Sequence, residues 1–163
     1  MKKLLYFSSG AGADAITFGS GVAKVKYVAG DGLNYASPSS ATAVTTVGMD
    51  IVTGLNAGDD VIMTGYTGIA ASSASNSIMD TDEVTGSDLS AVTLAENSVH
   101  IVRGTYSSAA DTFTESSTGA DSLFVYDGNV LAAANDYEAV VLVGTGAATF
   151  AVAAGTGGII DIS

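Results

Sequence analysis

The residues of this sequence that could do chemistry are mainly its carboxylates. The 163 residues include seventeen Asp and Glu, five Lys and Arg, one His, and neither Cys nor Trp. Calcium takes roughly six to eight oxygen ligands, many of them from carboxylates. We therefore take six acidic residues as candidate calcium ligands: Asp14, Asp59, Asp60, Asp80, Asp82 and Glu83. The simpler interpretation of each is a turn residue or a residue of a solvated loop.

The single histidine, His100, does not lie in a pattern typical of catalysis. It stands within the apolar run 99–102, which predicts a strand, and no Cys is available as a nucleophile. No phosphate loop, dinucleotide fingerprint or nucleophile elbow occurs. Paired carboxylates could hydrolyse a glycoside, but the sequence has no Trp to stack on a sugar ring. We predict that the chain is not an enzyme and has no catalytic residues.

Composition and charge exclude several classes of protein. Hydrophobic residues make up 47% of the chain, which argues against intrinsic disorder and for a single β-rich domain over residues 1–163. The net charge of -12 repels phosphates, so we expect no nucleic-acid partner. No apolar run reaches the roughly 20 residues of a membrane-spanning helix. The apolar stretch 4–7 is too short for a signal peptide and predicts a first strand.

Positive charge is concentrated at the start of the sequence. The first 26 residues contain Lys2, Lys3, Lys24 and Lys26 but only one acid, Asp14, so they carry a net charge of +3. The rest of the chain contains Arg103 and sixteen acids, a net charge of -15. One interpretation is that lysines cover the outer face of an edge strand. The other is that the four lysines form a docking face, within residues 1–28, for an acidic partner.

The pattern of apolar residues predicts short strands joined by Gly, Asp and Ser turns. The clearest is 22–28, in which Lys24 and Lys26 alternate with Val25 and Tyr27. The most apolar runs, 123–126 and 139–143, predict central strands. The stretch 29–40 predicts a loop, and 87–95 and 129–138 are the candidates for short helical segments. The fold class expected is all-β, an antiparallel sandwich or barrel with at most one or two short helices.

A short motif, Gly-x-Asp followed by an apolar strand, recurs along the chain. It begins at Gly12, Gly58 and Gly119. Glycine turns the chain, and the Asp side chain can accept hydrogen bonds from backbone amides of the turn. The motif therefore predicts a repeated way of starting a strand.

The first copy has a longer match. Residues 9–17, Ser-Gly-Ala-Gly-Ala-Asp-Ala-Ile-Thr, fit the nonapeptide Gly-Gly-x-Gly-x-Asp-x-apolar-x at every defined position except the first. This segment resembles the calcium-binding repeats of repeats-in-toxin proteins. Residues 19–25 look like a decayed second copy, with Ala23 in the Asp position and Lys24 beside it, and 50–62 and 121–127 resemble segments that follow such repeats. The resemblance implies Ca²⁺ and a secreted bacterial surface-layer, adhesin or filament subunit at the cell surface.

A second resemblance covers about the first 30 residues. The strand-like Lys3 to Phe7, a Gly and Asp turn, the segment 15–18 and an alternating strand look like the N-terminus of small tailed-phage structural proteins. This resemblance implies a non-catalytic virion surface component, either a capsid decoration or cement protein or a tail-associated protein. Its partners would be copies of itself or a capsid protein, and it would need no cofactor. We treat the virion as the first expectation and the secreted calcium module as the alternative.

Overall fold

The computed structural model describes residues 4–8, 10, 12–28, 33–35, 42–64, 99–126, 137–148, 150–152 and 159–163. Every regular element in these ranges is a β-strand, arranged in two sheets with mixed strand order. The prediction of an all-β sandwich is therefore confirmed. Among the described residues, no helix is long and apolar enough to cross a bilayer. The expected helical segment 87–95 lies outside the described residues.

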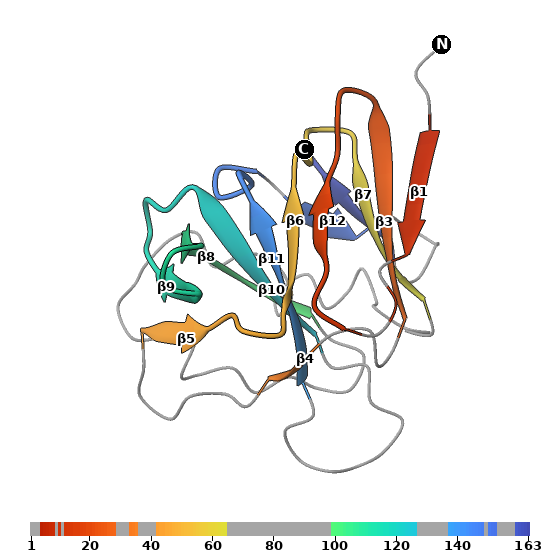
Figure 1. Cartoon of the computed structure of the whole chain (residues 1–163). Helices are drawn as coiled ribbons and strands as arrows, with labels where there is room; N and C mark the ends of the chain where they lie inside the picture. The colour runs from red at the N-terminus through yellow and green to blue at the C-terminus, as the bar shows by residue number, and fades with distance from the viewer. Residues whose placement is uncertain are drawn as a thin grey trace.

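The smaller sheet, sheet A, has five strands in the order β1-β3-β7-β13-β12. Their bounds are Leu4–Ser8, Val22–Val28, Asp60–Thr64, Ile159–Ile162 and Phe150–Val152. Figure 1 shows β1 as the outermost strand on the right, next to β3.

The larger sheet, sheet B, has the order β2-β6-β11-β10-β8-β9-β5, with β4 also paired to β11. In chain order these strands are β2 Ala15–Thr17, β4 Leu33–Tyr35, β5 Ala43–Thr45, β6 Asp50–Thr53, β8 Val99–Ser107, β9 Thr112–Glu115, β10 Asp121–Tyr126 and β11 Tyr137–Val143. The two most apolar strands, β10 and β11, are neighbours inside the sheet, as the sequence predicts.

The arrangement expected was antiparallel, but part of each sheet is parallel. β1, β3 and β7 run parallel in sheet A, and β2, β6 and β11 run parallel in sheet B. The cause is that the chain alternates between the sheets, from β1 to β2 to β3 and later from β6 to β7. Strands that return to the same sheet then lie parallel: Leu4 of β1 pairs with Val22 of β3, 18 positions on, and Ala15 of β2 pairs with Ile51 of β6, 36 positions on. The remaining pairs are antiparallel, some between consecutive strands such as β8 and β9 and others between distant strands such as β4 and β11.

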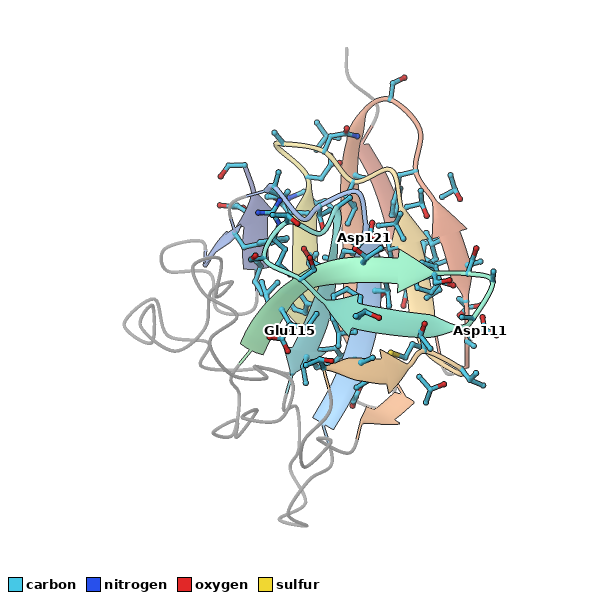
Figure 2. The ribbon with its side chains drawn as sticks, turned by 90° about the vertical axis from the view of Figure 1, so that its left-hand side faces the viewer. Asp111, Glu115 and Asp121 are labelled. Carbon is cyan, nitrogen blue, oxygen red and sulfur yellow. The ribbon has the colours of Figure 1, made fainter. Side chains whose placement is uncertain are left out.

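Two apolar cores lie on opposite faces of sheet B. One core lies between the sheets and includes Val25, Val61 and Phe124. The other contains Val102, Phe113 and Leu123 and lies under the strands β5 and β9. Figure 2 shows β8 bending across the front of the molecule, with β9 and β5 below it and the strands β10 and β11 behind. The result is three layers, with β10 and β11 in the middle.

Strand β3 agrees with the local prediction, whereas part of a predicted loop forms the strand β4. β3 has the predicted bounds, and its Val25 and Tyr27 are fully buried while Lys24 and Lys26 lie on the opposite face. The prediction of a loop over 29–40 is wrong at 33–35, because β4 forms there by pairing with Tyr137–Ala139 of β11. The helical turn expected within 129–138 is not tested, because residues 129–136 lie outside the described residues and only 137 and 138 are described, as the start of β11.

Candidate functional site

Asp50 joins two stacked turns of the parallel part of the fold. It is fully buried at the start of β6, and its Oδ1 accepts a hydrogen bond of 2.8 Å from the backbone N–H of Asp14, 36 positions earlier. Asp14 precedes β2, the parallel neighbour of β6, so the two acids occupy equivalent positions. The bond satisfies a backbone donor next to the strand start. Asp50 therefore fixes the register between β2 and β6.

Asp59 fixes the register between the parallel strands β3 and β7. It is 1% exposed, and its Oδ1 accepts a 2.8 Å bond from the N–H of Ala23, again 36 positions earlier. Its Oδ2 accepts a 2.7 Å bond from the N–H of Asn56, in the turn that leads into the strand. One carboxylate thus holds its own turn and the neighbouring strand at once.

Asp121 is the third buried carboxylate of this kind, and Figure 2 shows it above the curved strand β8. It is 7% exposed and begins β10. Its Oδ2 accepts a 2.8 Å bond from the N–H of Tyr106 in β8, and its Oδ1 accepts a 2.9 Å bond from the N–H of Gly144 after β11. Asp121 therefore connects the two strands that flank its own.

Three glycines allow backbone segments to touch beside Asp121. A Cβ atom at Gly119 would overlap the backbone of Gly104, and one at Gly146 would overlap the carbonyl of Gly119. The N–H of Gly146 donates a 2.8 Å bond to Ala120, and the Nε of Arg103 donates a 2.8 Å bond to the carbonyl of Gly119. These positions require glycine because no space exists for a side chain. The third Gly-x-Asp motif thus serves close packing as well as a turn.

Charged residues form a row across sheet A. Lys24 in β3 makes an ion pair with Asp60 in β7, and Asp60 pairs in register with Asp161 in β13. Asp60 is 8% exposed, whereas Asp161 as a whole residue is exposed. Partial burial of its carboxyl group and the nearby carboxyl group of Asp60 raise the pKa of Asp161 above its ordinary value, and the charge of Lys24 opposes this shift.

The structure describes two of the four lysines proposed as a docking face. Lys24 and Lys26 lie on the outer face of β3, whereas Lys2 and Lys3 lie outside the described residues. The expectation that these lysines decorate an edge strand is wrong for β3, which lies between β1 and β7. The alternation places Lys24 opposite Asp60 and Lys26 opposite Ile62. Of these two described lysines, Lys26 is the one that lies opposite an uncharged residue of β7.

The six candidate metal ligands do not form one group in the described part of the chain. Asp59 accepts backbone hydrogen bonds, Asp60 makes the ion pair with Lys24, and the backbone of Asp14 donates to Asp50. Asp80, Asp82 and Glu83 lie outside the described residues. Among the described residues, no group of three or more His, Cys, Asp or Glu side chains could hold a metal ion. His100 is in β8, opposite Val125 of β10.

Sequence reasoning missed the roles of Asp50 and Asp161. For Asp50, the spacing of 36 residues from Asp14 was present in the sequence, and the same spacing separates Ala23 from Asp59. Gly48-Met49-Asp50 repeats the Gly-x-Asp pattern of residues 12–14 after 36 positions, and stacking these two copies would have predicted the contact of Asp50 with Asp14. Asp161 carries no such signal, because its partner is fixed only by the antiparallel pairing of β13 with β7.

Comparison of this chain with protein-family models, with curated protein sequences and with solved structures finds no match.

Proposed function

We propose that this chain is a non-catalytic structural protein of a large assembly, a surface component of a phage virion. The observation that carries the proposal is the use of buried carboxylates. Asp50, Asp59 and Asp121 each accept backbone hydrogen bonds from neighbouring segments. Side chains that could do chemistry instead hold strands and turns in fixed positions, which suits a rigid building block.

The edges of the sheets offer positions for pairing with a neighbouring subunit. Among the described strands, β1 pairs only with β3, and β2 pairs only with β6. Asp14 and Phe18 bond toward β6, so the N–H and C=O groups of Ala15 and Thr17 point the other way by alternation. The exposed apolar side chains of Phe7 (37%) and Val47 (64%) add surface for contacts. Such edges support main-chain pairing between subunits.

Mass spectrometry of purified virions tests the proposal directly. We expect the chain in particles that remain intact through density-gradient purification, in a fixed number of copies per major capsid protein. Particles of full density that lack the chain would contradict the proposal.

Two lysines on one face of β3 test the docking role of the basic segment. When the purified Lys26→Ala variant is added to particles that were assembled in the absence of this protein, a smaller fraction of it should sediment with them than of the wild-type chain. The change should alter the free energy of unfolding by less than about 0.5 kcal/mol. Lys24→Ala is the matched control, because it removes the partner of the nearly buried Asp60 and should destabilise the fold by about 1–3 kcal/mol. Undiminished sedimentation of Lys26→Ala would exclude Lys26 from the docking face.

A second candidate function is a secreted calcium-binding module of a bacterial surface. The pairing of β1 with β3 favours it, because Leu4 aligns with Val22, eighteen positions on. Eighteen residues are two nonapeptides, and the turn between β1 and β2 holds the nonapeptide match at 9–17. The chain therefore completes one coil of the kind expected when nonapeptides alternate between two sheets.

The effect of Ca²⁺ on the melting temperature distinguishes the two candidate functions. An ion that binds only the folded chain stabilises it by about 2.7 kcal/mol at a concentration of 100 times its dissociation constant. The calcium module predicts a marked rise in melting temperature with Ca²⁺ that a chelator reverses and that Asp14→Asn reduces. The virion protein predicts equal melting temperatures with Ca²⁺ and with chelator.

A further inference from the structure

Residues 12–28 and 48–64 form consecutive layers of the parallel part of the fold. β2 pairs with β6 and β3 pairs with β7, each with an offset of 36 positions. Both pairs also contain the same carboxylate contact, in which an Asp of the second layer accepts the backbone N–H of the residue 36 positions earlier. The contact between these layers therefore shows how one layer of the fold receives a neighbour.

The first layer has the same acceptor, but its strand β2 has a neighbour on one side only. Asp14 lies 36 positions before Asp50 and is half-buried. The Oδ1 of Asp50 accepts the N–H of Asp14, whereas the carboxylate of Asp14 accepts no hydrogen bond within the described part of the chain. Among the described strands, β2 pairs only with β6. The carboxylate of Asp14 is therefore placed to accept an N–H from a further strand that runs parallel to β2.

The other end of sheet B is the strand β5, and it runs in the direction that such a contact needs. Antiparallel pairs lead from β5 to β9, then to β8, β10 and β11, which makes four reversals. β5 therefore has the direction of β11, which is parallel to β6 and β2. Figure 1 shows β5 at the left of the molecule and β6, the neighbour of β2, nearer its centre. If a second copy continues the sheet, its β5 lies parallel to β2.

The outer edge of β5 carries unpaired backbone groups, as the outer edge of β2 does. The carbonyl of Thr42 and the N–H of Thr46 bond toward β9 and the turn before it. By alternation, the N–H and C=O groups of Ala43 and Thr45 point to the opposite side. Both residues are exposed, so a second strand can approach them.

One register pairs the outward groups of the two strands. It places Ala15 of β2 opposite Val44 of the second copy, so that the N–H and C=O of Ala15 meet the outward-pointing residues of β5. The same register brings the N–H of Ala43 to the carboxylate of Asp14. This contact repeats the bond that the N–H of Asp14 donates to Asp50 within one chain. The negative carboxylate is then matched by a backbone donor of the second copy.

The two large apolar side chains that are exposed in the described part of the chain lie beside these two edges. Phe7 is 37% exposed, and its ring contacts that of Phe18, the residue after β2. Val47 is 64% exposed and lies two positions after β5. The register that opposes Ala15 to Val44 also brings Val47 of the second copy next to Phe18. The contact therefore covers both apolar side chains.

We propose that β5 of one copy of this chain adds parallel to β2 of another copy, so that the chain assembles head to tail. The inference rests on the edge pairing proposed above and names a second copy of the chain as the partner. The contact is heterologous, because one copy contributes β2 and the other contributes β5. Such copies form a ring if the rotation between them closes, and a filament if it does not.

Sedimentation velocity of the purified chain over a range of concentrations tests the association. The buffer contains a chelator, so that Ca²⁺ has no part in the result, and about 0.15 M salt to screen the net charge of -12. We expect the sedimentation coefficient of the wild-type chain to rise with concentration. Asp14→Ala should weaken the association about tenfold, because it removes one acceptor of a charge-assisted hydrogen bond.

Asp50→Ala is the matched control, because it removes the same carboxylate from the layer that is already paired. It should lower the midpoint of urea denaturation, whereas Asp14→Ala should leave that midpoint unchanged. A wild-type chain that stays monomeric at every concentration would overturn the proposal. Equal association of Asp14→Ala and the wild-type chain would overturn it as well.

Chemical cross-linking identifies the strands in contact. The chain has no Cys, so Ala15→Cys and Val44→Cys each carry a single thiol. A short bifunctional maleimide should join the two variants when they are mixed and should leave each variant alone as monomers. No cross-link in the mixture, or a cross-link in Ala15→Cys alone, would overturn the head-to-tail contact. The measurement uses the purified chain, so its outcome is independent of whether virions contain this protein.

Discussion

At the scale of single residues, the buried carboxylates hold neighbouring backbone segments together by accepting their hydrogen bonds. Asp121 accepts two backbone hydrogen bonds from segments that the sequence places far apart, and Asp59 also accepts two. A carboxylate has two oxygens that can both accept, and no neutral side chain of the same size has two. Asp is therefore required at these positions for the number of its acceptors.

Asp121→Asn tests this requirement. The amide keeps one acceptor and turns an NH₂ group toward the N–H of either Tyr106 or Gly144, so one buried donor loses its partner. We expect a loss of about 1–3 kcal/mol in the free energy of unfolding, measured by urea denaturation. Asp111→Asn, at an exposed residue, should change it by less than about 0.5 kcal/mol. Equal stability of the two variants would show that the carboxylate does not hold both amides.

At the scale of elements, the turn between β6 and β7 explains how the two sheets are linked. The N–H of Asp59 bonds to the carbonyl of Asn56 at 3.0 Å, and Gly58 has a φ of 90°. These values define a type II turn with Ala57 and Gly58 at its centre. Gly58 therefore supplies the left-handed residue, and the adjacent Asp59 closes the turn and holds Ala23 of the neighbouring strand β3.

Ala57→Pro tests the turn type. Proline is favoured at the first central position of a type II turn, Ala57 is exposed, and its N–H donates no hydrogen bond within the described part of the chain. The change should raise the free energy of unfolding by about 0.4–1 kcal/mol, because it restricts the unfolded chain. Gly58→Ala should lower it, since alanine is strained at a φ of 90°. A loss of stability in Ala57→Pro would mean that the turn has another geometry.

At the scale of the whole molecule, the sequence predicts the strands better than their arrangement. Alternation fixes the faces of Val25 and Tyr27, and apolar runs identify β10 and β11, because both signals are local. The strand β4 and the pair Asp60–Asp161 were not predicted, because each depends on a partner more than 90 positions away. The parallel stacking left a trace in the sequence, the spacing of 36 residues, but a period seen only twice is a weak signal.

The middle layer has a consequence for how this protein can vary. All six residues of β10 are buried, with Leu123 and Val125 in one core and Phe124 and Tyr126 in the other. No position in this strand can accept a new charge without disturbing one of the two cores. Substitutions that change the surface of the molecule without loss of stability must therefore fall outside this central strand.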